Sequence, residues 1–323
     1  MKYNALVLMS GGADSLLAAR LLLEQDINIT AISFYSPFFS SDEAERLAGF
    51  LSIPFLSMDL TNEMIEIIKN PRYGLGSGAN PCIDCHGLML RKSVFLMKEL
   101  NAHFIATGEV VGQRPMSQQK NSLNLIAKMS GAKELVLRPL FAKIMKPTLP
   151  ELKGWIDRSK LERISGRGRK RQVELIEKFG YQNETALYSS GGCLLTDKTI
   201  GRRVKDLVKH DQLNERNAKL LTIGRHFRIS ERLKIILTRR EDEDAMIKKI
   251  ITENSLEPTD DYSGPTAAII TEDILSEEDV NIAANLIASY TKYENDTEIL
   301  IDFNGKIIRT KKIPKKNFSR WLI

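Results

Sequence analysis

The stretch "ALVLMSGGADSLLAARLL", residues 5–22, decides the fold of the N-terminal part of the chain. An apolar run ends at Ser10, two glycines follow, and a helical pattern begins at Asp14. Gly11 and Gly12 allow a sharp turn with exposed backbone N–H groups, to which the helix N-terminus adds positive dipole. This unit predicts an anion site suited to phosphate. The alternative is an ordinary turn in which Asp14 or Ser10 caps the helix.

The kind of phosphate site follows from what is missing after the glycines. No lysine follows them, so the stretch is not the P-loop that holds a γ-phosphate for transfer. A site without that lysine suits a pyrophosphate group that leaves as one unit.

Apolar strand patterns alternate with amphipathic helical patterns through residue 110. Strands are predicted at residues 3–10, 28–36, 54–60 and 102–110, and helices at 14–25, 41–52 and 84–100. A fifth strand at 124–128, followed by 134–140, is predicted to complete the sheet. The alternation predicts an α/β fold, a parallel sheet covered on both faces, with ligands at the carboxyl ends of its strands. The long loop at 69–82 is typical of a functional segment.

The remaining chain differs in composition. Residues 152–174 carry eight Lys and Arg against three Asp and Glu, and two strand–helix segments follow in the last hundred residues. We therefore predict three domains within the 323 residues: a nucleotide-type α/β domain at 1–150, a basic helical linker at 151–220, and a smaller α+β domain at 221–323.

Composition and charge exclude some classes of protein. With 42% hydrophobic and 27% charged residues the chain is a globular protein with ample core. No apolar stretch approaches the ~20 residues of a membrane span, so no membrane partner and a cytoplasmic location are expected. The net charge of +6 is compatible with a polyanionic partner. Three cysteines are too few for a disulfide framework and indicate metal or redox chemistry, or none.

The "SGGADS" turn resembles the SGGxDS signature of the PP-loop ATP pyrophosphatases. The resemblance covers about residues 3–145, since the later "ATGE" and "LRPL" also fall where that family has counterparts. It implies an adenine nucleotide alpha hydrolase-like fold that uses ATP and Mg²⁺, releases pyrophosphate and attaches AMP to a carbonyl oxygen. The residues implied to bind the nucleotide are Ser10, Gly11, Gly12, Asp14 (also near Mg²⁺), Ser15, the backbone from Ile32 through Ser33 to Phe34, Thr107, Gly108 and Glu109.

The cysteines lie in two motifs. "NPCIDCH" contains Cys82 and Cys85, and "SSGGCLLTD" contains Cys193. Cys85 lies at a predicted helix N-terminus, where the dipole is expected to lower its pKa. The alternative is that the first two form a helix-start pair and that Cys193 is a small buried hydrophobe.

The cysteine motifs resemble the tRNA thiolation branch of the PP-loop family, with its 2-thiouridylases, 4-thiouridine synthetases and 2-thiocytidine synthetases. Cys85 matches the catalytic cysteine and Cys193 the second one, so these two and Asp14 are the implied catalytic residues. Cys82 stands where 2-thiouridylases usually have an acidic residue, which makes the chain similar to the 2-thiocytidine type. There a CxxC pair and one distant cysteine hold a [4Fe–4S] cluster, which implies Cys82, Cys85 and Cys193 as its ligands.

Two alternatives to the cluster stay open. In the first, Cys85 carries a persulfide and Cys193 resolves it as a disulfide. In the second, the cysteines and His86 bind zinc; the commoner role of such a histidine is as a first-turn helix residue.

The resemblance implies an ATP-dependent tRNA sulfurtransferase that adenylates a pyrimidine carbonyl and replaces its oxygen with sulfur. Its implied partners are tRNA and a sulfur donor, which is a cysteine desulfurase, a sulfur carrier or sulfide; a homodimer is compatible with the accessory domain. The alternatives are a PP-loop ligase that adenylates a small molecule and a non-catalytic RNA-binding or sulfur-trafficking protein.

Two features predict RNA contacts. The run "SGRGRKRQ" is expected to touch the phosphate backbone through Arg167, Arg169, Lys170 and Arg171, unless it is only a solvated face. Gln113 and Arg114 are expected to touch phosphate or RNA, or to lie in a solvated loop. The segment from about Leu221 resembles the RNA-binding domain of NFACT-type proteins in "TRREDEDAMIKKI", "GPTAAII" and "NIAANLIASYTK", with "TRREDED" in place of the usual Gly-Arg-Asn run.

Overall fold

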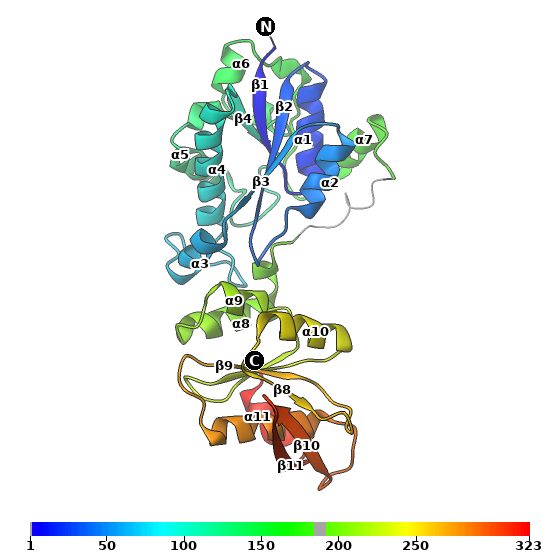
Figure 1. Ribbon diagram of the computed structural model, residues 1–323. Helices are drawn as coiled ribbons and strands as arrows, with labels where there is room; N and C mark the ends of the chain where they lie inside the picture. Colours follow the sequence, from blue (N-terminus) through cyan, green and yellow to red (C-terminus); the bar gives the residue numbers. More distant parts are fainter. Residues whose placement is uncertain (1, 184–191) are drawn as a thin grey trace. The chain divides into compact units, whose positions relative to one another are not determined.

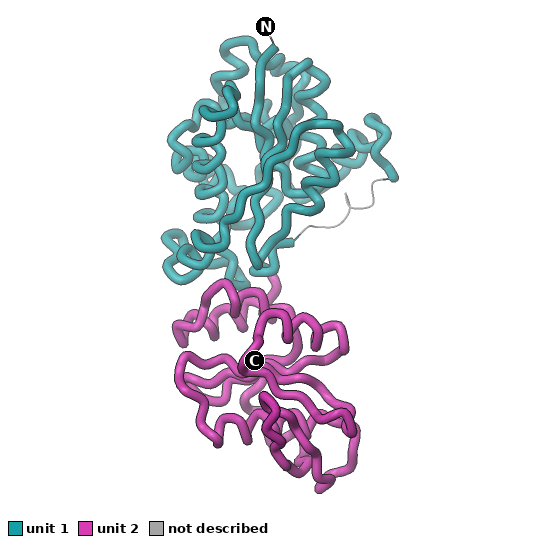
Figure 2. Tube along the Cα trace, viewed as in Figure 1, with its two compact units in different colours: residues 1–196 teal, residues 197–323 magenta. Residues whose placement is uncertain are grey.

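The structure is a computed structural model that describes residues 2–183 and 192–323. It divides into two compact units, residues 1–196 and 197–323, which are described separately below (Figure 2). The three-domain division with boundaries at 150 and 220 stays a prediction. Among the described residues, no helix combines the length and apolar character that crossing a bilayer requires.

Unit 1 (residues 1–196) is built on a five-stranded sheet with the order β3-β2-β1-β4-β5, in which every pair is parallel (Figure 1). Its strands are β1 (Asn4–Leu8), β2 (Asn28–Tyr35), β3 (Phe55–Asp59), β4 (Phe104–Thr107) and β5 (Val136–Leu137). The predicted fold class is confirmed. The strand order reverses around β1, so the crevice for a ligand is expected at the carboxyl ends of β1 and β4.

Helices cover both faces of this sheet (Figure 1). One face carries α1 (Ala13–Leu23), α2 (Asp42–Phe50) and α7 (Lys170–Lys178), whose apolar side chains form one core with β1 and β2. The other face carries α4 (Cys82–Glu99) and α5 (Lys120–Met129). The remaining helices of unit 1 are α3 (Thr61–Lys69) and the short α6 (Leu149–Leu152).

The predicted fifth strand at 124–128 is wrong. Those residues belong to α5, whose buried Leu123, Ile126 and Ala127 follow the three- and four-residue spacing of a helix. The fifth strand is the two-residue β5, inside the later predicted segment 134–140.

Unit 2 (residues 197–323) is an antiparallel sheet with the order β11-β10-β8-β9-β7-β6. Its strands are β6 (Arg225–Arg228), β7 (Lys234–Leu237), β8 (Ser255–Pro258), β9 (Ala267–Ile270), β10 (Glu298–Phe303) and β11 (Lys306–Lys311). Its helices are α8 (Lys198–Lys209), α9 (Glu215–Lys219), α10 (Glu241–Ile250), α11 (Glu277–Tyr290) and the 3-10 helix η6 (Lys315–Trp321).

The two sheet faces of unit 2 bury different helices. Ile235 and Leu237 of β7 face α11, whereas Ile236 between them faces α10. This alternation of buried residues is that of a strand covered on both sides. The predicted α+β character of the C-terminal part is confirmed.

Candidate active site

The glycine turn after β1 presents an open helix N-terminus. Gly11 has a φ of +78°, and a Cβ there would lie 2.6 Å from the Cβ of Glu43. Gly12 is the N-cap of α1, and no side chain caps that helix. The Ser15 hydroxyl stabilises the turn from inside, since it donates to the Gly12 carbonyl at 2.8 Å and accepts from the Ser10 N–H at 3.3 Å. The first N–H groups of α1 are therefore available to an anion.

The end of β4 lies against the same turn. A Cβ at Gly108 would be 2.5 Å from the Ser15 nitrogen and 2.6 Å from the Asp14 carbonyl carbon. Because these are backbone atoms, they cannot turn aside as a flexible side chain does. The structure thus brings Gly108, directly after Thr107 at the end of β4, against the glycine turn; their binding of a nucleotide stays a prediction.

The two carboxylate oxygens of Asp14 differ in their hydrogen bonding. Its Oδ2 accepts from Nε2 of Gln113 at 2.9 Å. Asp14 Oδ1 and Gln113 Oε1 are both buried, and neither has a hydrogen-bond partner among the described residues. Burying two oxygens without hydrogen-bond partners destabilises the folded protein. They fit a hard cation such as Mg²⁺, which takes carboxylate and amide oxygens as ligands.

The end of β2 offers backbone groups beside this turn. The Met9 N–H donates to the Ile32 carbonyl at 2.8 Å, so Ile32 faces β1. Alternate residues of a strand face the same neighbour, so Phe34 directs its backbone N–H and carbonyl to the same side, beyond the end of β1. Ser33 faces β3 instead, where it pairs with Ser57. Of the three residues predicted to read adenine, Ile32 to Phe34, Phe34 has backbone groups directed to this side beyond the end of β1.

A buried ion network joins the end of β4 to α4. Glu109 Oε1 lies 3.0 Å from His86 Nδ1, while Oε2 accepts from Arg138 Nε at 2.8 Å and from the Thr107 hydroxyl at 3.0 Å. Burial alone would raise the pKa of Glu109, but the Arg138 charge and the His86 hydrogen bond outweigh it and lower that pKa to about 2. Arg138 was not among the expected site residues, although the quoted "LRPL" contains it.

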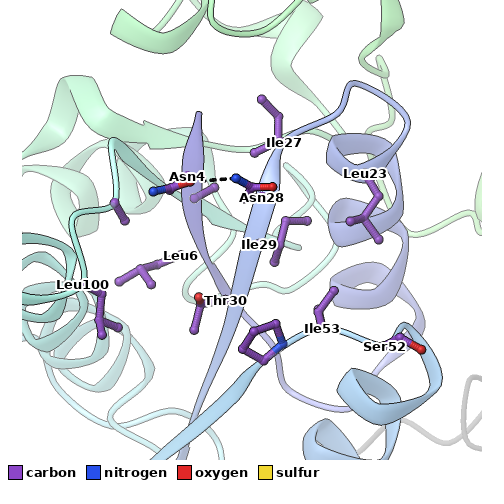
Figure 3. A pocket seen from close by; sticks show the side chains of 13 residues that line it. Asn4, Leu6, Leu23, Ile27, Asn28, Ile29, Thr30, Ser52, Ile53 and Leu100 are labelled. Atoms are coloured by element: carbon purple, nitrogen blue, oxygen red, sulfur yellow. Dashed lines mark hydrogen bonds between the residues drawn. The ribbon is translucent and has the colours of Figure 1, made fainter. Parts of the chain in front are cut away.

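A cavity of about 460 Å³ lies elsewhere in unit 1 (Figure 3). Its lining includes Asn4, Asn28 and Ile29, at the beginnings of β1 and β2, and the Asn28 side chain donates to that of Asn4 at 3.1 Å. The glycine turn follows the opposite end of β1. The cavity is therefore not the nucleotide site that the sequence predicts.

Cys82 and Cys85 begin α4, one helical turn apart. Cys82 is half-buried and accepts a hydrogen bond from Nδ2 of Asn80 at 3.0 Å, whereas Cys85 is buried. His86 follows directly and bonds Glu109, which links the cysteine-bearing turn to the residues around Gly108.

The segment that carries Cys193 is docked on the loop before α4. The Leu195 carbonyl accepts from the Ala79 N–H at 2.9 Å, and the Leu194 N–H donates to the Phe38 carbonyl at 2.9 Å. A Cβ at Gly78 would lie 2.2 Å from the Leu195 oxygen, so this contact requires glycine. Residues distant in sequence are thereby brought beside the first turn of α4.

The three thiols are free and close enough to act on one another's ionisation. Burial raises the pKa of Cys85 well above its usual value, and Cys193, Cys82 and Asp84 add to the rise. Burial also raises the pKa of Cys193 to about 11, with Cys82 contributing to the rise, while the Leu195 backbone and Arg114 act against it. The expectation that Cys85 has a lowered pKa is wrong, because burial outweighs the helix dipole.

Thiols are the ligands that metal–sulfur groups use in proteins. Cys85 is buried and Cys82 and Cys193 are half-buried, and each thiol would lose its proton on binding a metal. Among the described residues, no three His, Cys, Asp or Glu side chains are arranged to hold a single metal ion. His86 is turned toward Glu109.

The predicted RNA-binding run begins near Gln113 and Arg114. The Gly166 N–H donates to the Val111 carbonyl at 2.8 Å, which ties the run to the segment that follows β4. Arg167, Arg169 and Lys170 are exposed. Arg171 is also exposed, but it is paired with Glu162 at 2.8 Å and with Glu174 at 3.0 Å. The charge of Arg171 is thus largely used within the protein.

Comparison with known families now adds to this geometry. Residues 1–146 match the family described as thiamine biosynthesis protein (ThiI), and residues 224–322 match the NFACT protein RNA binding domain. Both resemblances are confirmed. The ThiI match covers the parallel sheet with its glycine turn and the first two cysteines, and the NFACT match covers the antiparallel sheet of unit 2.

Individual relatives are more distant. The chain is similar to the tRNA-specific 2-thiouridylase MnmA 1 of Clostridium tetani, with 33% identity over 33% of this chain and 34% of that protein. It is also similar to a probable tRNA sulfurtransferase of Staphylococcus aureus, with 27% identity over 42% of this chain and 34% of that protein. The matches thus span about a third of the length of these curated relatives.

A solved structure that resembles part of the chain is a 4-thiouridine synthetase–RNA complex with bound ATP. The identity is 20%, the match covers 58% of this chain and 54% of that one, and the TM-score is 0.36.

Proposed function

We propose that the protein is an ATP-dependent tRNA sulfurtransferase that adenylates a pyrimidine carbonyl and replaces its oxygen with sulfur. The observation that carries this proposal is the chain of contacts from the glycine turn through Gly108, Glu109 and His86 to the first turn of α4, which carries Cys82 and Cys85. The ThiI and NFACT RNA binding matches and the two tRNA-modifying relatives support the choice of tRNA as substrate.

The nucleotide half of the site holds ATP. The backbone N–H groups at Gly11 and Gly12 and the start of α1 bind the phosphates. Asp14, with Gln113, holds Mg²⁺, which would offset the charge of the departing pyrophosphate. The backbone of Phe34 binds the adenine edge.

The chemistry proceeds in two displacements. The pyrimidine oxygen attacks the α-phosphorus of ATP, and the bond from that phosphorus to the pyrophosphate oxygen breaks. A sulfur nucleophile then attacks the ring carbon, and the carbon–oxygen bond breaks with AMP as the leaving group. The carbonyl oxygen is a poor leaving group, and its conversion to AMP makes it a good one before sulfur attacks.

The thiol half supplies the sulfur. We propose that Cys82, Cys85 and Cys193 hold a [4Fe–4S] cluster, because the docked segment 193–196 brings the third thiol to the loop before α4, whose first turn carries the other two. Such a cluster would supply a binding place for the sulfide that replaces the base oxygen.

A persulfide route is the second delivery scheme. Cys85 would receive sulfane sulfur as a persulfide from a cysteine desulfurase, and the outer sulfur would attack the ring carbon while AMP leaves. The Cys193 thiolate would then attack the Cys85 sulfur and break its bond to the outer sulfur, which releases the thiolated base and leaves a Cys85–Cys193 disulfide. The two thiols thus supply the two electrons that reduce the sulfane sulfur. Cys82→Ala separates the two schemes. If the cluster scheme holds, the anaerobically purified variant loses both iron and activity, whereas retention of both favours the persulfide scheme.

The sulfur donor and a homodimer stay predictions.

The activity is tested by incubating the protein with ATP, sulfide and unmodified tRNA. We expect pyrophosphate release that depends on tRNA, together with one thiolated pyrimidine in mass spectrometry of the nucleosides. Release without any RNA dependence would favour a small-molecule ligase, and no release under any condition would favour a non-catalytic RNA-binding protein.

A further inference from the structure

The last residues of the sequence are basic, with no acidic residue among them. Between residues 303 and 323 there is no Asp or Glu, and the seven Lys and Arg there are Lys306, Arg309, Lys311, Lys312, Lys315, Lys316 and Arg320. Such a run is a solvated face unless its charges are unpaired and lie beside groups that recognise a ligand.

Some of these charges are used inside unit 2. Lys306 pairs with Glu277 at 3.3 Å, and Arg309 pairs with Glu298 at 3.5 Å. Lys312 donates to the Thr291 carbonyl at 3.0 Å. Among the described residues, Lys315, Lys316 and Arg320 form no ion pair with a carboxylate, and all three are exposed.

Two of these unpaired cations, Lys315 and Arg320, lie over aromatic rings, as does Arg225. The Tyr290 ring, at the end of α11, has the Arg225 guanidinium 5.0 Å and the Lys315 ammonium 4.9 Å from its centroid. The Arg320 guanidinium is 4.4 Å from the Trp321 ring. Tyr290 and Trp321 are each partly exposed.

Buried Phe227 links the two aromatic residues of this region. Leu322, next to Trp321, pairs with Phe227 of β6, and the Phe227 and Tyr290 ring centroids are 6.0 Å apart. Arg225 begins β6. We name Arg225, Tyr290, Lys315, Lys316, Arg320 and Trp321 the tail face. It combines cations for phosphates with aromatic rings for unpaired bases, which is the composition of single-stranded RNA sites.

The start of α10 has the opposite character. Four carboxylates fill its first turn, and Arg240 there is paired with Asp242 at 2.8 Å. This is the place where the NFACT-type resemblance would put a Gly-Arg-Asn run. Its carboxylates repel RNA phosphates, so the tail face is the better-suited surface of unit 2.

We propose that the tail face is the surface of unit 2 that binds tRNA, with its cations on phosphates and Tyr290 or Trp321 stacked on an unpaired base. The inference rests on the proposed function for the identity of the RNA. It does not rest on the thiolation chemistry.

The test measures tRNA affinity of the full chain against salt concentration, without ATP. For K315Q/K316Q/R320Q we expect affinity to fall roughly 10- to 100-fold and the salt slope to decrease by about two, because about three phosphate contacts are lost. Tyr290→Leu is expected to weaken binding with the slope unchanged, since stacking releases no counterions. Thermal melting verifies that each variant is folded.

The matched control is R240Q/K306Q/R309Q, which removes the same charge from three ion-paired positions. We expect its affinity and slope to stay near those of the unsubstituted protein. Equal weakening of both triple variants, or no weakening of the tail variant, would overturn the proposal. The proposal would also be overturned if K315Q/K316Q/R320Q lost binding to phosphatidylserine vesicles but kept its affinity for tRNA, because the tail face would then be a membrane-binding surface. A protein that binds tRNA through the tail face but thiolates nothing would refute the proposed function alone.

Discussion

At Gly108 the fold leaves room for a hydrogen atom and no more. The start of α1 lies directly against it, with the Ser15 nitrogen 2.5 Å from where a Cβ would be. At the scale of single residues, such contacts decide whether the glycine turn keeps the shape that we propose binds phosphate.

Gly108→Ala is expected to push β4 and α1 apart and weaken ATP binding about 10- to 100-fold, since overpacking of this kind costs about 1–3 kcal/mol. Titration calorimetry with a non-hydrolysable ATP analogue measures this. The control is Gly49→Ala in α2, which meets nothing within 4 Å and should be neutral or stabilising by about 0.5–1 kcal/mol. Equal ATP affinity in both variants would refute the close-contact argument.

Glu109 gives the ion network a defined pH dependence. Its pKa is lowered to about 2 from an ordinary 4.5, so its contribution to stability is complete above about pH 4.5 and is lost as the pH falls toward 2. We expect Glu109→Gln to be destabilised at pH 7, and its difference in Tm from the unsubstituted protein to shrink between pH 4.5 and 2. Glu134→Gln, at an exposed position, should show no such trend. A difference for Glu109→Gln that is constant with pH would contradict the network.

At the scale of elements, the decisive contact is between the loop before α4 and the segment 193–196. Neither is a regular strand, yet together they place Cys193 beside Cys82 and Cys85. Gly78 of the long loop therefore has a structural purpose, which is close approach to the Leu195 carbonyl.

Gly78→Ala should displace the Cys193 segment, because its Cβ would lie 2.2 Å from the Leu195 oxygen. We expect ATP affinity to be retained, since the glycine turn is untouched, and the thiolated product to fall at least about tenfold. Gly168→Ala, which meets nothing within 4 Å, serves as the control. Full thiolation by Gly78→Ala would show that the docked segment has no part in sulfur transfer.

Local patterns predicted the elements whose residues are buried at regular spacing. The four strands β1 to β4 and the helices α1, α2 and α4 were all expected near their observed positions. The helical state of segment 124–128 was not expected. Its few apolar residues fit the spacing of a strand as well as that of a helix, and only the preceding residues distinguish the two. The two-residue β5 is too short to have a period.

The features of the site also divide into those with a local sequence pattern and those that depend on residues distant in sequence. The glycine turn is local in sequence, and the structure brings Thr107 and Gly108 to it as expected. The raised pKa of Cys85 depends on burial and on Cys193, and the pairing of Glu109 with Arg138 joins two separate strands. Neither is written in a local pattern, so one was predicted wrongly and the other was missed.

At the scale of the whole molecule, one chain combines two units to which we assign different tasks. Unit 1 combines the glycine turn with three thiols, and unit 2 carries the antiparallel sheet that matches the NFACT RNA binding domain. We expect loss of RNA contacts in unit 2 to raise the KM for tRNA with little change in kcat, because the reacting groups lie in unit 1. Steady-state kinetics of the K315Q/K316Q/R320Q variant measures this, and a fall in kcat with KM unchanged would contradict it.

The most direct test of the central claim follows the oxygen atom. Unmodified tRNA is transcribed with ¹⁸O in the pyrimidine carbonyls, and the purified protein is given this RNA with ATP and sulfide. Adenylation of the base requires AMP that contains one ¹⁸O, in an amount equal to the thiolated nucleoside formed. Thiolated nucleoside accompanied by unlabelled AMP would show that ATP activates something other than the base, and the claim would be wrong.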